Sequence, residues 1–424
     1  MPELKNRTIP KGIYIPPANP DYAKIVAAGY DTVQEAWDIS AGEYLTNRLE
    51  CAQGAAKENA AGGRCGFAEM DIHGHHFVMS SVGAKGGVKY VFSNDDLMFL
   101  VREGSVWGLS VRYLSAGLWE WGWTALQEHA LEICQIIGFK CDDWDAINMR
   151  VSRCDYAFDF QSDMFASEKA GDLIENIVLS HKRKVKLTTS SEEVAQKSTA
   201  FETKGGSMIE VWANAKAVQT ITIGKMPSLQ LQVYNKTDEI TEISGKDWMI
   251  ELWQNSGRYE HGKPVYRLEI RFPKGFLKSR NMQSRELIQK DLFKIVLDAL
   301  ISNRLTHQKR FNRDTDDQRK YRWDLHPLWA LIIDQCGVFE LPPLGHRVTG
   351  KREALKADLI KQISGTLRSC TVLSLGKYEQ EEMEKLGFKA IEQLNDEAND
   401  TGERFDQRKI DNAKARYSYV SEAG

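Results

Sequence analysis

Charged side chains recur at every second position in two short segments that are otherwise apolar. The segments are 151–160 and 265–272, and their alternating charged residues are Arg153, Asp155, Asp159, Arg267, Glu269 and Arg271. Side chains alternate between the two faces of a β-strand, so each segment would gather its charges on one face. The outer face of an antiparallel sheet alternates in this way by default, but acidic residues are depleted in strands. Carboxylate oxygens are ligands that Mg²⁺ and Mn²⁺ prefer, so Asp155, Asp159 and Glu269 are candidate metal ligands.

A third short segment, 229–234, ends on a tyrosine. Its apolar residues alternate with polar ones, the last of which is Tyr234, and Lys236 follows two positions later. A tyrosine hydroxyl beside a metal ion is a candidate covalent nucleophile. Because its ordinary pKa is about 10, Tyr234 needs a base or a nearby positive charge to lose its proton. Glu239 and Lys236 are the candidates for these two roles.

These three segments resemble the motifs of a known family, in order and in approximate spacing. Segment 153–160 resembles the R-h-D-h-A-h-D block of rolling-circle replication initiators of the Rep-trans type, where h is a hydrophobic residue. Segment 233–239 resembles their h-Y-[ND]-K-x-x-E block, which carries the DNA-nicking tyrosine, and 266–270 resembles their R-h-E-h block. The recognisable part spans roughly residues 105–275. The family includes plasmid and filamentous-phage replication initiation factors and related conjugative relaxases.

The resemblance implies an enzyme that nicks and rejoins DNA at a replication origin. Tyr234 would attack a phosphodiester, forming a 5′-phosphotyrosine and leaving a free 3′-OH for a polymerase. Mg²⁺ or Mn²⁺, held by some of the three carboxylates, would polarise the scissile phosphate. Lys236, Arg153 or Arg267 would offset the developing negative charge. The implied partners are origin DNA, double-stranded with a single-stranded nick site, and the host helicase and polymerase.

Two departures from the family pattern keep other functions open. Gln232 stands where family members usually carry an arginine, and segment 220–224 lacks their usual aromatic residue. A conjugative relaxase of an integrative element would use the same nicking reaction and the same residues. A catalytically inactive DNA-binding regulator on the same fold is the alternative from another class, and Gln232 is the feature that favours it.

The composition is that of an ordinary globular chain. Its 424 residues suggest two or three domains. Its formal net charge of -3 argues against a protein that coats nucleic acid non-specifically. Residues 1–20 have no apolar signal core, and no apolar stretch is long enough to cross a membrane. The seven cysteines are scattered and form no CxxC pair. We therefore expect a reduced, cytoplasmic protein without a membrane partner.

The periodicity of apolar residues predicts an α+β fold, with an antiparallel sheet nuclease core flanked by helices. The resemblance implies a sheet like that of the HUH nucleases, without their His-hydrophobic-His pair. Further strands are expected at 73–80, 88–93 and 105–115, helices at 123–138, 167–180, 246–255 and 285–304, and a loop or weak helix at 52–66. We divide the chain into an N-terminal strand-containing region (1–104), a catalytic nicking domain (105–304) and a mainly helical C-terminal region that contributes to origin specificity (305–424).

Two basic segments are candidate DNA contacts. The larger one interleaves cations with aromatic side chains, a pattern that suits contact with phosphates and stacking on unpaired bases. Its residues are Arg304, Lys309, Arg310, Phe311, Arg313, Arg319, Lys320, Tyr321, Arg322 and Trp323. The smaller segment comprises Lys182, Arg183, Lys184 and Lys186. Solvated helix ends and loops carry similar charge runs, so exposure alone is the alternative explanation for both.

Two further motifs fall short of a site. Segment 73–76 has three histidines, but Gly74 replaces the bulky hydrophobic residue of an HUH metal site, so an exposed polar loop or strand is favoured. Segment 345–352 nearly matches a phosphate-binding GxxxxGK loop, but Arg352 replaces its Ser or Thr. We therefore expect no helicase motor in the chain and a host helicase as its partner. The oligomeric state stays open, with a dimer as one alternative.

Overall fold

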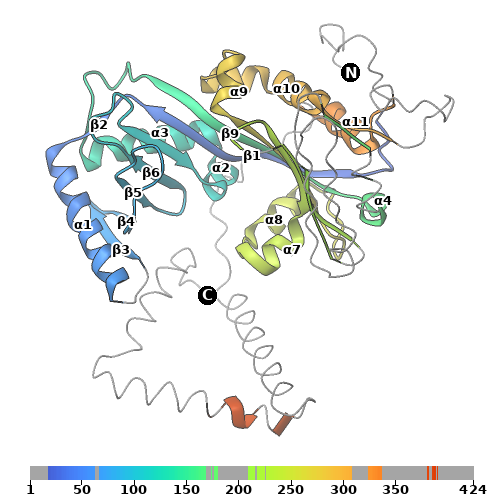
Figure 1. Ribbon diagram of the computed structural model, residues 1–424, viewed down its shortest axis with the longest axis horizontal. Helices are drawn as coiled ribbons and strands as arrows, with labels where there is room; N and C mark the ends of the chain where they lie inside the picture. The colour runs from blue at the N-terminus through green and yellow to red at the C-terminus, as the bar shows by residue number, and fades with distance from the viewer. Residues whose placement is uncertain are drawn as a thin grey trace.

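The computed structural model describes residues 18–62, 66–168, 176–179, 209–214, 217–224, 226–307 and 323–336, together with position 173 and a few positions between 380 and 389. In this part of the chain, eleven strands form one sheet in the order β11-β12-β13-β14-β9-β1-β7-β6-β5-β4-β3 (Figure 1). The strands are β1 (Lys24–Trp37), β3 (Phe67–Ile72), β4 (His75–Ser80), β5 (Tyr90–Ser93), β6 (Leu97–Val101), β7 (Leu109–Tyr113), β9 (Met149–Gln161), β11 (Ile209–Asn214), β12 (Ala217–Ile223), β13 (Gln230–Asn235) and β14 (Tyr266–Pro273).

Two short ladders and a set of helices complete the described fold. The ladders pair β2 (Ser40–Ala41) with β8 (Phe139–Lys140), and β10 (Ile177–Leu179) with β15 (Asn303–Leu305). The helices are α1 (Glu43–Ala61), α2 (Ser115–Trp121), α3 (Trp123–Ile137), α4 (Asp163–Ser167), α7 (Lys236–Glu239), the π-helical turn Ile240–Ser244, α8 (Trp248–Asn255), α9 (Lys274–Ser279), α10 (Arg285–Ser302) and α11 (Pro327–Gln335). None of the helices in the described part of the chain is long and apolar enough to cross a lipid bilayer.

The large sheet consists of two halves with the same plan. In the first half β1 lies innermost, and the later strands run from the edge strand β3 back to β7, which pairs with β1. In the second half β9 lies innermost, and the later strands run from the edge strand β11 back to β14, which pairs with β9. The long antiparallel pairing of β1 with β9 joins the halves. The domain boundary expected near residue 104 falls between β6 and β7, inside this continuous sheet.

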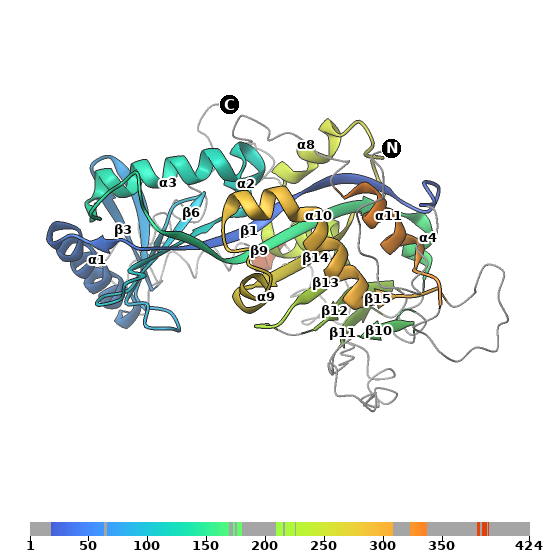
Figure 2. The ribbon, with the colours of Figure 1, turned by 90° about the horizontal axis from the view of Figure 1, so that it is seen from above.

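Helices cover the two faces of the sheet unequally. One face carries the main core, to which α1, α3, α10 and α11 contribute buried apolar side chains. Figure 2 places α1 and α3 over the first half of the sheet and α9, α10 and α11 over the second. Figure 1 shows α7 and α8 on the opposite side from α9, α10 and α11. On that side a smaller core packs Trp119 of α2 and Met249, Leu252 and Trp253 of α8 against the start of β1.

The expected α+β fold with a large antiparallel sheet is confirmed. The helices expected at 123–138, 246–255 and 285–304 are α3, α8 and α10. The helix expected over 167–180 is wrong at its end, because Ile177–Leu179 is a strand whose partner β15 lies far later in the chain. Segment 52–66 belongs to α1 up to Ala61, in keeping with the high helix propensity of alanine. Most of the C-terminal region, including 345–352, lies outside the described residues.

Candidate active site on the central strands

The three charged segments lie side by side in the sheet as β13, β14 and β9. One row of the antiparallel ladder joins Tyr234, Arg267 and Asp159. A second row, four residues away along β9, joins Arg271 and Asp155. Because side chains alternate along each strand, these residues point to one side, which we call the charged face.

The row at Tyr234 forms a buried charge network under α8. Asp159 and Arg267 are both fully buried. Arg267 donates hydrogen bonds from Nε and Nη2 to the two oxygens of Asp159, at 2.6 and 2.9 Å, and from Nη1 to Asp31 at 2.5 Å. The indole Nε1 of Trp253 also donates to Asp159, at 2.8 Å. Burial lowers the pKa of Arg267, but the two aspartates more than offset this and hold it well above its usual value. Arg267 is therefore a fixed positive charge.

Lys236 and Glu239 lie in α7, the short helix that follows β13. Lys236 is buried, and its Nζ donates to the Glu239 carboxylate. The same Nζ lies 5.8 Å from the centre of the Tyr234 ring. Burial and the charge of Arg267 lower the pKa of Lys236. Both residues predicted to assist Tyr234 thus lie close to it, paired with each other.

The row at Asp155 belongs to the more open part of the charged face. Arg153 donates from Nε to both oxygens of Asp155, at 3.0 and 2.9 Å, and its side chain is 28% exposed. Arg271 donates from Nε to Glu269 Oε1 at 2.6 Å, and its side chain is 24% exposed. The hydroxyl of Tyr234 donates to Glu269 Oε2 at 3.3 Å. Glu269 therefore connects the tyrosine to the open part of the face.

Burial shifts both Asp155 and Tyr234 towards their neutral forms. Burial raises the pKa of Asp155 to about 7; the hydrogen bond from Arg153 opposes this rise and the charge of Glu269 adds to it. Burial also raises the pKa of Tyr234 well above its usual value; Arg267 opposes this rise and Glu269 adds to it. The tyrosine is thus protonated at neutral pH, and added positive charge near its hydroxyl would favour ionisation.

Two of the three candidate metal ligands lie close together. Asp155 and Glu269 are near enough for the charge of Glu269 to raise the pKa of Asp155. Asp159 lies four positions farther along β9, which is about 13 Å at the rise of a strand. Its oxygens are already bound by Arg267 and Trp253. No group of three or more His, Cys, Asp or Glu side chains is placed to hold a metal ion within the described residues, so the three carboxylates do not form one site.

The sequence placed Arg271 on the charged face without a role and did not identify Asp31. Arg271 continues the every-second-residue pattern of Glu269, which is the signal that identifies it. Asp31 carries no such signal, because it lies at an irregularity in the pairing of β1 with β9. Gln232, the departure from the family pattern, donates to Thr222 Oγ1 at 3.1 Å. The guanidinium beside Glu269 is therefore supplied by Arg271 and not from position 232.

Most of the predicted DNA contacts lie outside the described residues, namely Lys182, Arg183, Lys184, Lys186, Lys309, Arg310, Phe311, Arg313, Arg319, Lys320, Tyr321 and Arg322. Arg304 lies on β15 and is half-buried, and burial lowers its pKa. Trp323 is half-buried and precedes α11. Of the three histidines at 73–76, His73 lies in the turn between β3 and β4, and His75 and His76 begin β4. They belong to no metal-binding group in the described part of the chain.

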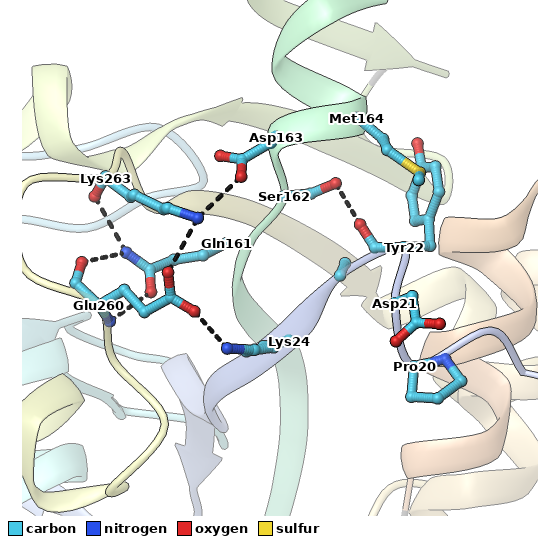
Figure 3. A pocket seen from close by; sticks show the side chains of 11 residues that line it. Pro20, Asp21, Tyr22, Lys24, Gln161, Ser162, Asp163, Met164, Glu260 and Lys263 are labelled. Atoms are coloured by element: carbon cyan, nitrogen blue, oxygen red, sulfur yellow. Dashed lines mark hydrogen bonds and ion pairs between the residues drawn. The ribbon is translucent and has the colours of Figure 1, made fainter.

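A cavity of about 340 Å³ lies beyond the buried end of the charged face, between the start of β1 and the end of β9 (Figure 3). Four of its charged side chains pair with one another. Lys263 binds Asp163 at 2.7 Å and Glu260 at 2.8 Å, and Lys24 also pairs with Glu260. Gln161 donates to the main-chain carbonyls of Glu260 and Lys263. These contacts close the loop that precedes β14, so we assign the cavity a structural role.

No family model and no curated protein matches the sequence. Among solved structures, the chain is similar to the rolling circle replication initiator protein from Geobacillus stearothermophilus, with 13% sequence identity and a TM-score of 0.36. The similarity covers 75% of this chain and 98% of that chain. At this level of similarity, function has to be inferred from the residues of the chain itself.

Proposed function

We propose that the chain nicks and rejoins DNA through a covalent bond to Tyr234, as an initiator of rolling-circle replication of a phage or plasmid. The observation that carries the proposal is the position of the Tyr234 hydroxyl, 3.3 Å from Glu269, where the buried and open parts of the charged face meet. The resemblance of three segments to the Rep-trans motifs points to the same residues, and these segments are neighbours in the sheet.

The nicking step follows from the contacts of Tyr234. Glu269 passes the hydroxyl proton on to solvent as the Tyr234 oxygen attacks phosphorus, which forms the phosphotyrosine bond and breaks the bond to the 3′ oxygen. The carboxylate thus stays ionised. The 3′ oxygen takes a proton from solvent and becomes a free 3′-OH. Arg267 lies opposite the tyrosine in the ladder, where its charge favours the tyrosinate. Attack of a 3′-OH on the phosphotyrosine reverses the step and rejoins the strand.

Arg153 and Arg271 are the groups that would bind the scissile phosphate. Each now pairs with a carboxylate, and their side chains are 28% and 24% exposed, so each can exchange that partner for a phosphate. Mg²⁺ is commonly held by one or two carboxylates together with substrate phosphates. Asp155 and Glu269 fit that requirement for Mg²⁺ or Mn²⁺, which when bound polarises the phosphate.

Covalent trapping tests the assignment of Tyr234. The substrates are plasmids and single-stranded oligonucleotides that carry fragments of the replicon encoding the chain, incubated with Mn²⁺ or with EDTA. The wild-type protein is expected to relax the supercoiled plasmid that carries the origin and to stay covalently bound to the 5′ end of the nicked strand. Tyr234→Phe is expected to form no such adduct. Tyr44→Phe, at a 52% exposed tyrosine on α1, is the matched control. An adduct with Tyr234→Phe would show that another residue is the nucleophile.

The same assay separates the alternative functions. Asp155→Asn and Glu269→Gln are expected to abolish nicking and to keep DNA binding. Specific binding without any cleavage by the wild-type protein would favour an inactive DNA-binding regulator. Nicking at a transfer origin, next to genes for a coupling protein and a secretion apparatus, would identify a conjugative relaxase. Extension of the free 3′ end in host extract, dependent on a host helicase and polymerase, would support the replication role.

A further inference from the structure

An arginine track crosses the open part of the charged face and leads away from Tyr234 into the first half of the sheet. It comprises Arg271 on β14, Arg153 and Arg150 on β9, Arg112 on β7 and Arg102 just after β6. We propose that this track binds the phosphate backbone of the single DNA strand that Tyr234 attacks. The proposal rests on the nicking function above, and it adds residues of the first half of the sheet to the DNA-binding site.

The pairing of the strands places most of the track in two adjacent rows. One row consists of Arg112, Gln34 and Arg153 on β7, β1 and β9. The next row consists of Ser110, Ala36 and Arg150 on the same strands. Arg102 extends the second row, because its Nη1 donates to the Ser110 hydroxyl at 2.9 Å. Neighbouring strands lie about 4.8 Å apart and alternate residues about 7 Å apart, so the guanidinium groups form a continuous series.

The track carries positive charge that the described part of the chain does not neutralise. Among the described residues, Arg102 and Arg112 donate to neutral acceptors, and the guanidinium of Arg150 stacks on the Trp107 ring at 3.8 Å. The Nε of Arg150 is buried and has no hydrogen-bond partner there. Burial and the charge of Arg153 lower the pKa of Arg112. Five arginines and the two carboxylates of the open face give a net charge of +3 (5 − 2).

The path from Tyr234 to the end of the track has the length of a short stacked strand of DNA. The path from the row of Tyr234 to the row of Arg150, at the far end of the track, covers nine positions of β9 (159 − 150). That distance is about 30 Å at the rise of a strand, the length of about nine nucleotides stacked at 3.4 Å. The helices α1 and α3 pack on the other face of the first half. Proteins that follow a single strand combine such a charged path with aromatic side chains, and Trp107 lies at the end of this one.

In this proposal the second half of the sheet carries the cleavage residues, and the first half contributes only to DNA binding. Leu100 on β6 occupies the position that Tyr234 occupies on β13, because each lies one residue before the end of its ladder. Arg112 on β7 correspondingly occupies the position of Glu269 on β14. The first half thus has neither the hydroxyl nor the carboxylate of the nicking site. A guanidinium at this position can hold a phosphate, and the residue on β6 that matches the nicking tyrosine is a leucine.

Binding measurements with a non-cleaving protein test the track. The full chain with Tyr234→Phe is titrated with a fluorescent single-stranded 30-mer of mixed sequence, and anisotropy is recorded over a series of salt concentrations. Arg112→Gln and Arg150→Gln are each expected to weaken binding about five- to tenfold. Each is expected to make the slope of log K against log salt shallower by about 0.7, the value for one lost phosphate contact on a single strand.

A matched control distinguishes the track from general loss of charge. Arg48→Gln removes an exposed arginine on α1 that also donates to a neutral acceptor, the Asp71 carbonyl, and it is expected to leave binding unchanged. Circular dichroism during heating checks that each variant is folded, and Arg102→Gln replaces any variant that is not. Wild-type affinity and salt slope in folded track variants, equal losses with Arg48→Gln, or tighter binding of a duplex would each overturn the proposal. None of these outcomes depends on whether Tyr234 forms an adduct.

Discussion

The proposed site needs Asp155 as an ionised carboxylate, but its burial in the folded chain disfavours ionisation. Its pKa in the folded chain is about 7, compared with about 3.9 for an unperturbed aspartate. One pKa unit corresponds to about 1.36 kcal/mol, so ionising this fully buried group costs the folded state about 4 kcal/mol. Because folding raises the pKa, the folded chain binds the proton more tightly than the unfolded chain does. The contribution of this group to stability is present at acidic pH and is lost as the pH rises through about 7.

Asp155→Asn removes the charge and keeps the shape of the side chain. We expect its free energy of unfolding to exceed that of the wild type by up to about 4 kcal/mol at pH 8. The difference should grow by about 1.4 kcal/mol per pH unit between pH 5 and pH 7 and nearly vanish around pH 4. Urea unfolding followed by tryptophan fluorescence, in buffer with EDTA at each pH, measures this difference. The same variant should have lost nicking activity.

Asp31→Asn is the control with the opposite sign. Asp31 is 15% exposed, and its partial burial raises its pKa, but Arg267 and two lysines lower it to a net value below the usual one. Stability from this group is therefore present above pH 4 and lost as the pH falls, so Asp31→Asn should be destabilised most at neutral pH. A variant Asp155→Asn that is less stable than the wild type at pH 8 would refute the reasoning. It would mean that the ion pair with Arg153 outweighs the burial of the carboxylate.

Other substitutions test the packing that supports the site. Arg267→Met is expected to lower the free energy of unfolding by about 3–5 kcal/mol, because it leaves Asp159 buried without its cation; a loss below about 1 kcal/mol in denaturant titration would contradict the buried pair. Gly29→Ala is expected to cost about 1–3 kcal/mol, since its Cβ would lie 2.8 Å from the Trp119 ring; an unchanged thermal midpoint would show that the ring can shift. Glu35→Ala is expected to lower the free energy of unfolding by more than about 3 kcal/mol in denaturant titration, because the buried carboxylate accepts hydrogen bonds from four side chains. An unchanged free energy of unfolding would mean that these donors find other partners. The four side chains are Trp37, Tyr113, Trp123 and Gln127.

The sequence allowed the strands of the site to be predicted, because period-two alternation is a local property. Which charged residues of this face are buried and which are accessible could not be predicted, because that depends on the elements that cover each row. Arg267 and Arg271 both flank Glu269 at the same spacing. Only the packing of α8 makes the first a buried partner of Asp159 and leaves the second half-exposed. The similarity of strand order between the two halves of the sheet also could not be predicted, because no repeated sequence accompanies it.

The connection between β13 and β14 explains why the face divides at Tyr234. This segment follows the tyrosine directly, and its helix α8 returns over the strands so that Trp253 binds Asp159. The same packing that fixes Arg267 opposite the tyrosine also removes water from it, and burial then raises the pKa of Tyr234. The hydroxyl consequently stays protonated until positive charge arrives on the open side. In the proposed reaction, phosphate draws Arg153 and Arg271 away from their carboxylates, and the carboxylates can then hold a cation. Activation of the nucleophile would thus be coupled to the arrival of DNA.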